Sequence, residues 1–173
     1  AADPVLREST RVCAVHSGGG QATYDLYKWE SEVYNNYDGQ GTTYTIDSMV
    51  NLLGFATYSN FYGGLDSNYQ VLYDADLIQY RQDVDMLYHM SDDDPPLYLE
   101  NGALQLLPRD NLYHHSLHGQ TLHQVALSAG ISEVKAKITA LEVNTTEGES
   151  KNEFLTRHLN ACSQTTSIDP IKE

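Results

Sequence analysis

Two consecutive prolines constrain the fold of this chain more than any other feature. Pro95 and Pro96 fix two φ angles and remove two backbone donors, so no helix can pass through them. They are followed by Leu97-Tyr98-Leu99, a short apolar run of strand-forming residues. Apolar residues recur at helical spacing before the prolines, from Tyr73 to Met90, and again after the strand. This alternation of helices and strands predicts an α/β fold with a parallel sheet.

Three segments have the pattern of strands in such a sheet: residues 11–16, 97–101 and 134–139. The first is a continuous apolar run, typical of a strand covered on both faces, and the glycine-rich segment from Ser17 to Gly20 ends it. A long helix is expected from Asn111 to Ala129, closed by Gly130. The sequence therefore predicts half of a doubly wound, mostly parallel sheet with helices on both faces. Residues 1–162 would form this unit, and residues 163–173 a polar tail.

Residues 35–70 form a long insertion that is rich in glycine, asparagine, serine and tyrosine. A connection of this length inside a compact domain is usually functional. Tyrosines give a large contact area at a low entropic cost, so they suit an interface. We expect contacts with a partner chain or a ligand among Tyr37, Tyr44, Tyr58, Phe61 and Tyr62. The alternative is that these side chains pack an irregular loop against the body of the protein.

The formal charge of −14 argues against binding to nucleic acid or to anionic membranes, because phosphates would be repelled. No apolar run has the length of about 18 residues that a membrane span needs. An extracellular or periplasmic location is favoured over the cytoplasm.

Cys13 and Cys162 form no metal-binding pair and are either joined in a long-range disulfide or buried as free thiols. Asn144 begins a glycosylation sequon, which has meaning only if the chain is secreted.

The densest cluster of titratable side chains surrounds His114, His115 and His118. On one continuous helix His114 and His118 would share a face, as zinc ligands often do. The alternative is a set of polar histidines hydrogen-bonded near the start of the helix. The acidic triplet that ends at Asp94 lacks the glycine and the distal glutamate of a calcium-binding loop, which favours a plain acidic turn. No segment has the pattern of a cofactor site, so none is expected.

Three segments carry a family resemblance: Asp3 to Val12, Gln21 to Asp25 and Ser91 to Pro96. They resemble the C-terminal half of α/β-hydrolases of the bacterial carboxylesterase and lipase-like kind, over most of the chain. The resemblance implies that a nucleophile elbow would lie upstream of the first segment. Leu104 stands where the family has its acid, and the loop from Leu141 to Ser150 lacks the family's histidine. Only Asp94 and His115 lie near the loops where substitutes for the acid and the base are expected.

Two functions follow from this resemblance and its departures. The first is a non-catalytic structural or binding scaffold, because a site can be lost while the core of a fold is kept. Its first strand would be an exposed apolar edge, which we expect to pair with another polypeptide. That partner would be the N-terminal half of the same product or a second copy of the chain. The alternative is the C-terminal fragment of an ester hydrolase whose serine lies in a missing N-terminal half.

Overall fold

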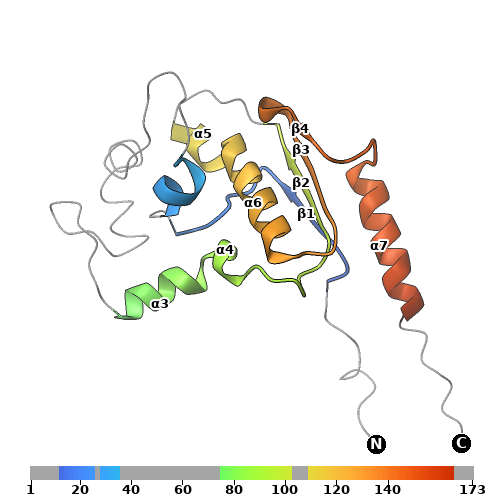
Figure 1. Cartoon of the computed structure of the whole chain (residues 1–173), viewed down its shortest axis with the longest axis horizontal. Coiled ribbons are helices and arrows are strands. Elements are labelled where there is room, and N and C mark those ends of the chain that lie inside the picture. Colours follow the sequence, from blue (N-terminus) through green and yellow to red (C-terminus); the bar gives the residue numbers. More distant parts are fainter. Residues whose placement is uncertain (1–11, 26–27, 36–74, 103–108, 166–173) are drawn as a thin grey trace, which may run out of the picture.

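The computed structural model describes residues 12–25, 28–35, 75–102 and 109–165 of the chain, drawn in colour in Figure 1. The Tyr-rich insertion, its five candidate interface residues and Leu104 lie outside the described residues. The described elements are, in chain order, β1 (Val15–Gly18), η2 (Trp29–Val33), α3 (Ala75–Asp83), α4 (Met86–His89), β2 (Leu97–Asn101), α5 (Arg109–His114), α6 (Ser116–Ala129), β3 (Val134–Ile138), η3 (Thr139–Leu141), β4 (Val143–Asn144) and α7 (Lys151–Thr165).

The sheet has four strands in the order β1-β2-β3-β4. β1, β2 and β3 are parallel, with Val15 opposite Leu97 and Leu97 opposite Val134. β4 is a two-residue antiparallel strand beside β3. Since parallel neighbours need a crossover connection, the helices α5 and α6 carry the chain from β2 back to β3. The expected α/β fold with a mostly parallel sheet is confirmed.

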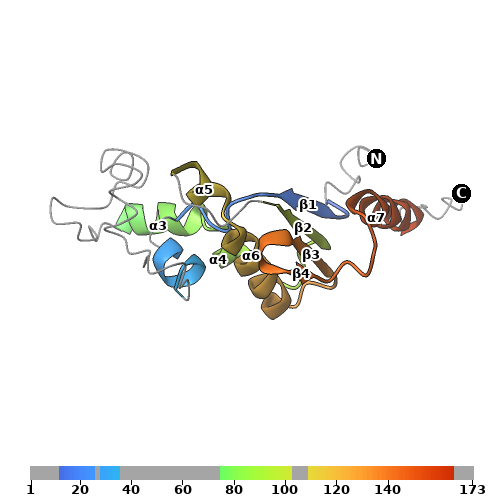
Figure 2. The ribbon, with the colours of Figure 1, turned by 90° about the horizontal axis from the view of Figure 1, so that it is seen from above.

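Helices cover both faces of this sheet, as expected: α6 lies on one face and α7 on the other (Figures 1 and 2). Alternate residues of β2 therefore meet different helices. Tyr98 packs edge to face on Phe154 of α7, with 5.5 Å between the ring centroids. Asn101 faces α6, where a Cβ added at Gly119 would lie 3.3 Å from the Cβ of Asn101. The small residue thus lets α6 approach the sheet closely.

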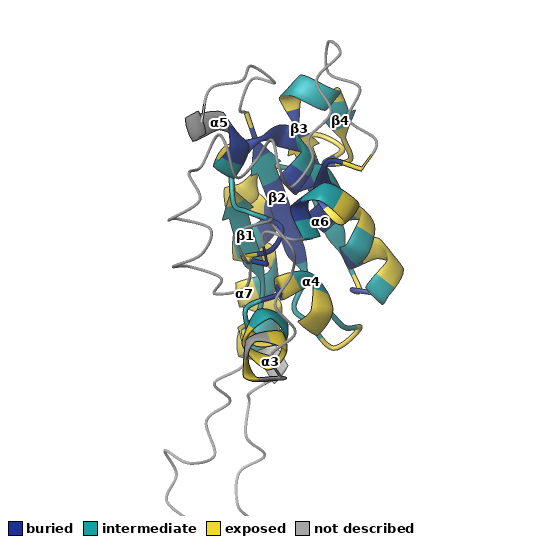
Figure 3. Cartoon of the chain, turned by 90° about the vertical axis from the view of Figure 1, so that its left-hand side faces the viewer, coloured by how far each residue is buried: buried dark blue, intermediate teal, exposed yellow. Residues whose placement is uncertain are grey.

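The main hydrophobic core lies between α6 and the sheet, and β2 runs through the buried centre of the molecule (Figure 3). Trp29 of the π-helical turn η2 is fully buried there and donates its indole N–H to the Thr23 carbonyl at 3.0 Å. Its ring also packs edge to face on His118, with 4.8 Å between the centroids. Burial of an aromatic side chain of this size is a large apolar contribution to stability. The tryptophan therefore anchors the segment that follows β1 to α6.

The limits of two strands differ from the expected ones. β1 covers Val15–Gly18 rather than residues 11–16, so the strand continues into the glycine-rich segment. Gly18 stays extended within the strand, and the chain turns only at Gly19, whose φ of 64° favours glycine. β3 ends at Ile138, because Thr139 begins a 3-10 turn. The middle strand has the expected limits, 97–101.

Two of the expected helices are broken by buried polar side chains. Asp85 separates α3 from α4: its carboxylate accepts the Leu87 N–H and pairs with Lys28. His115 separates α5 from α6, so the helix expected from Asn111 to Ala129 is two helices. Gly130 does end the second of them, with a φ of 85°. α7 continues to Thr165, three residues into the segment expected as a polar tail.

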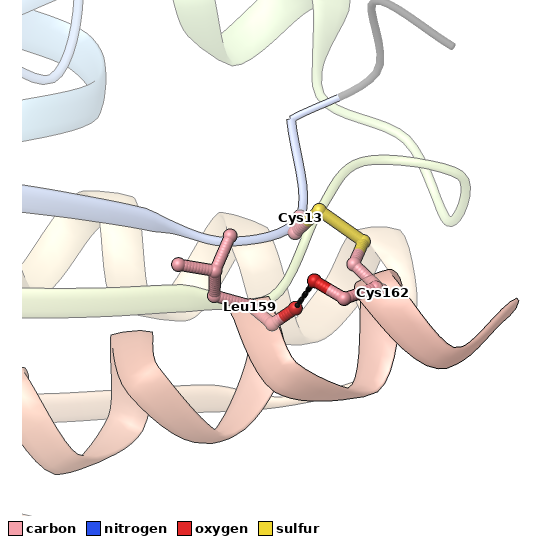
Figure 4. The surroundings of a disulfide bond; sticks show 4 residues. Cys13, Leu159 and Cys162 are labelled. Atoms are coloured by element: carbon pink, nitrogen blue, oxygen red, sulfur yellow. Dashed lines mark hydrogen bonds between the residues drawn. A yellow bond between two sulfur atoms is a disulfide. The ribbon is translucent and has the colours of Figure 1, made fainter. Parts of the chain in front are cut away.

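A disulfide joins Cys13, just before β1, to Cys162 of α7 (Figure 4). Of the two possibilities that the sequence left open, the structure has the cross-link. The bond closes a loop with a sequence separation of 149 and fixes the last helix to the first strand. Among the described helices, none combines the length and the apolar character that crossing a membrane requires.

Candidate functional site

Polar side chains gather outside the carboxyl ends of β1 and β2, the usual place for a ligand in an open α/β sheet. We call Asn101, His114, His115 and His118 the carboxyl-end cluster. Asn101 is the last residue of β2 and is buried, and its amide donates to the carbonyls of His114 and His115 at 3.2 and 3.3 Å. The His114 carbonyl ends α5, where helix carbonyls lack partners of their own, and the His115 carbonyl also accepts the His118 N–H at 3.0 Å. Asn101 therefore stabilises the break between α5 and α6.

His115 itself caps the second helix. Its backbone is extended, and its Nδ1 accepts the Leu117 N–H at 3.2 Å. The side chain is fully buried, and its ring packs edge to face on Tyr34 with 5.5 Å between centroids. Burial lowers the pKa of His115 to about 4, because the apolar surroundings disfavour the charged form. The imidazole is thus neutral near pH 7 and serves as a helix cap.

His118 connects three segments of the fold. Its Nδ1 accepts the Ala22 N–H at 3.2 Å, so the ring proton is on Nε2, which donates to the Leu112 carbonyl at 2.9 Å. The Tyr34 hydroxyl donates to the same carbonyl at 2.8 Å. Burial lowers the pKa of His118 to about 4, against the opposing effect of the bond to Leu112. Both ring nitrogens are engaged in holding the segment after β1 against α5 and α6.

His114 is different, because its side chain is exposed. Its Nδ1 lies 2.7 Å from the Gly19 carbonyl oxygen, which can only accept, so Nδ1 donates. In the neutral ring Nε2 is then the basic nitrogen, and no described residue bonds to it. His114 is therefore the member of the cluster with a ring nitrogen oriented and open to solvent.

The structure does not bring the suggested zinc ligands together. His114 ends α5 and is exposed, whereas His118 is buried in α6 with both nitrogens bonded to the backbone. The break at His115 removes the shared helix face on which the zinc hypothesis depended. Among the described residues no group of three histidine, cysteine, aspartate or glutamate side chains is placed to hold a metal ion.

Asp94 and His115, the suggested substitutes for an acid and a base, lie at opposite ends of β2. Asp94 precedes the strand and accepts the Ser91 N–H at 2.8 Å, in an acidic turn. His115 adjoins Asn101 at the other end. The strand between them covers about 13 Å at roughly 3.3 Å per residue step. The two side chains are too far apart to act as a pair.

A second polar group lies on the α7 face of the sheet. Glu100 of β2 pairs with Lys151 of α7 at 3.1 Å, and its carboxylate lies 3.6 Å from His16 Nε2. The hydrogen bond from Lys151 lowers the pKa of Glu100 despite some desolvation. His16 has Gly18 beside it on the strand, where an added Cβ would lie 3.2 Å from the imidazole. This group links β1, β2 and α7 close to the open side of β1.

That open side is the β1 edge, which we define as the side of Val15–Gly18 that faces away from β2. The Val15 and Gly19 N–H groups bond to carbonyls beside β2, at 2.9 and 2.8 Å. In a parallel pair alternate residues bond to alternate sides, so the backbone groups of His16 and Gly18 point outward. No other strand among the described residues pairs with β1.

Two exposed apolar side chains accompany this edge. Val12 precedes the disulfide and is 58% exposed, and Leu159 of α7 is 60% exposed. Leu159 and Cys162 are one helical turn apart, and both lie on the side of α7 that meets the start of the first strand (Figure 4). The disulfide holds these side chains beside an unpaired strand.

Asn144, the sequon residue, is exposed in β4. Its side-chain carbonyl accepts the Thr146 N–H at 3.2 Å and the Thr146 hydroxyl at 2.8 Å. The side chain thus forms a local turn of the kind that asparagine favours.

Several of these residues were not anticipated from the sequence. Asn101 carried one usable signal, since a buried amide at the carboxyl end of a parallel strand often bonds to a neighbouring loop. No signal in the sequence pointed to Glu100, His16 or Lys151, because their proximity depends on how β1, β2 and α7 pack. The sequence likewise did not indicate that Leu159 is exposed, because this leucine is one of the apolar residues of an amphipathic helical pattern.

No protein-family model, curated protein or solved structure matches this chain. The functional conclusion therefore rests on the fold and on the geometry of these residues.

Proposed function

We propose that this chain is a non-catalytic structural or binding scaffold whose sheet is completed at the β1 edge by a strand of another polypeptide. The observation that carries the proposal is the combination of outward-facing backbone groups at His16 and Gly18 with the exposed Val12 and Leu159. Edge strands are templates for pairing with another chain, and proteins that remain alone usually shorten or charge them. The strand at the other edge of the sheet, β4, is short in this sense, because it has two residues.

The carboxyl-end cluster supports the same proposal. An ester hydrolase needs a nucleophile, a base and oxyanion donors held together. His115 and His118 are buried and neutral, and both perform structural roles as a cap and a connector. Both ring nitrogens of His118 bond to the backbone, so neither is left for a carboxylate to orient. The cluster is therefore better suited to holding the fold than to turnover.

The disulfide bears on where such an assembly would form. Cross-links of this kind persist in oxidising compartments, which favours an extracellular or periplasmic scaffold. The partner would be the N-terminal half of the same gene product or a second copy of this chain. In both cases the docking surface includes Val12 and Leu159.

Light scattering after size-exclusion chromatography tests the proposal on the full chain. Because an open apolar edge promotes pairing, we expect association at micromolar concentration, and we expect Leu159→Lys to reduce it at least about tenfold. Leu127→Lys is the matched control, because Leu127 is 55% exposed on α6, away from the β1 edge. A monodisperse, folded monomer, or equal effects of the two variants, would contradict the proposal.

One observation favours a second candidate, an ester hydrolase that is active only with its missing half. His114 is oriented by the Gly19 carbonyl and presents Nε2 to solvent, as a general base requires. Incubation of the assembled protein with a short-chain aryl ester and a serine-reactive phosphonate tests this candidate. Turnover together with a serine label, both lost in His114→Ala and kept in His89→Ala, would support an esterase. If neither turnover nor labelling is observed, the scaffold function is the one that remains.

A further inference from the structure

A groove of about 430 Å³ shares no lining residue with the carboxyl-end cluster or the β1 edge. We call it the α4 groove and define it by its lining residues: Tyr24, Asp83, Val84, Met86, His89, Met90 and Asp94. Its walls are the loop after β1, the corner between α3 and α4, and the acidic turn before β2. Its apolar lining comes from Tyr24, Val84, Met86 and Met90, and Tyr24 is 50% exposed.

Two ion pairs fix the walls of the groove in place. Arg81 of α3 makes two hydrogen bonds of 3.0 Å to the carboxylate of Asp25, which is buried in the loop after β1. Lys28 pairs with Asp85, which is buried and caps α4. Paired, hydrogen-bonded carboxylates of this kind hold one geometry. The groove is therefore preformed rather than a gap between loose segments.

The lining of the groove carries negative charge. Arg81 and Lys28 are engaged with the buried Asp25 and Asp85. Asp83 and Asp94, which line the groove, form no ion pair with any described residue. Asp83 receives only the Gln79 side-chain amide, and Asp94 only the local backbone of its turn. A cation entering the groove would thus meet two carboxylates whose charge is not compensated.

Exposed apolar side chains also occur outside the groove. Ile78 and Tyr80 of α3 and Tyr88 of α4 are all exposed, and Figure 3 shows these two helices largely in the colour of exposed residues. The Tyr88 ring packs on the groove-lining His89, with 5.2 Å between the ring centroids, and so adds apolar surface next to the groove. A charge of −14 on the chain also draws basic partners toward it.

We propose that the α4 groove binds a basic amphipathic peptide segment of a partner protein, with one lysine or arginine side chain lying across Tyr24, Met86 and Met90. The aliphatic stem of that side chain packs on the tyrosine and methionine surface. Its cationic end reaches Asp83 and Asp94, where it also gains from the face of the tyrosine ring. Apolar residues beside it lie on Tyr88, whose ring packs on the groove-lining His89. This site is independent of the β1 edge.

The test titrates the full chain with a fluorescent nonapeptide of alternating leucine and lysine, followed by anisotropy. We expect saturable binding that weakens with salt, and no binding of the peptide with glutamate in place of lysine. Tyr24→Ala should weaken binding about tenfold, and Asp83→Asn about three- to fivefold, as expected for a central anchor and a rim charge. Thermal unfolding of each variant shows that the fold is retained.

Two control variants make the proposal falsifiable. Glu32→Gln removes the same charge from an exposed residue of η2, and Leu127→Ala removes an exposed apolar side chain from α6. Both should leave the affinity within about twofold. If Glu32→Gln weakens peptide binding as much as Asp83→Asn does, the effect comes from the net charge of the chain, and the proposal is overturned. Unchanged binding in Tyr24→Ala, or equally tight binding of n-butylammonium alone, would also overturn it.

Discussion

At the scale of single residues, the buried histidines decide how the stability of this protein depends on pH. His115 and His118 are fully buried, and burial lowers their pKa values from 6.5 to about 4. Both are neutral in the folded state, whereas the unfolded chain protonates them below about pH 6.5. Between these pH values the unfolded state binds more protons, so the free energy of unfolding decreases as the pH falls.

We therefore predict a loss of stability between about pH 6.5 and pH 4.5, with a slope of up to about 1.4 kcal/mol per pH unit for each proton taken up. The lowered pKa values of Glu133 and Glu149 change the free energy of unfolding only at pH values below this range. His118→Gln keeps an acceptor and a donor but removes the titration, so its unfolding free energy should change less steeply with pH. Urea denaturation at several pH values measures this. An unchanged slope in His118→Gln would contradict the assignment.

At the scale of elements, the contact between α6 and the sheet depends on one glycine. A Cβ at Gly119 would lie 3.3 Å from Asn101 and 3.4 Å from Ile138, near the carboxyl ends of β2 and β3. We predict that Gly119→Leu lowers the free energy of unfolding by about 2–3 kcal/mol, because a long side chain here forces the helix away from the strands. Gln124→Leu on the exposed side of α6 should cost less than about 0.5 kcal/mol in the same urea denaturation. Similar costs for the two variants would mean that the helix is not closely packed at Gly119.

α7 is held to the other face by Phe154 and by the disulfide. Phe154 is fully buried and packs on Tyr98, and Arg157 adds hydrogen bonds to Glu133 and Glu149 at the helix surface. We predict that Phe154→Ala costs about 3 kcal/mol, the usual result of removing a buried ring. Hydrogen exchange should rise in the amides of α7 and stay slow in α6. Thr156→Ala, at an exposed position of the same helix, should change neither. Equal exchange increases in both helices would show that α7 unfolds only with the whole protein.

At the scale of the whole molecule, the disulfide between Cys13 and Cys162 joins segments from the two ends of the described chain. A cross-link over a loop this long restricts the unfolded state strongly, which is typically worth about 2–5 kcal/mol. We predict that reduction lowers the melting temperature of the wild type. The double variant Cys13→Ser, Cys162→Ser should melt at the lower temperature with or without reductant. A wild-type melting curve that is insensitive to full reduction would contradict this stabilising role.

The sequence alone determined the class of fold and the position of the central strand. The two prolines stop a helix and the apolar run after them forms β2 within its expected limits, because both effects are local. Gly130 ended α6 for the same reason. The periodicity on both sides of the strand was also enough to predict helices on both faces of a mostly parallel sheet.

Only the tertiary structure decided where those helices break and which polar groups meet. A helical pattern from Asn111 to Ala129 is interrupted because Asn101, at the end of a distant strand, bonds to the carbonyls at His114 and His115. The sequence suggested His118 as a metal ligand. In the structure it is buried, and the Ala22 N–H and the Leu112 carbonyl bond to its two ring nitrogens. The cysteines became a disulfide because α7 packs beside β1. Such long-range contacts override local helix preferences because those preferences are weak.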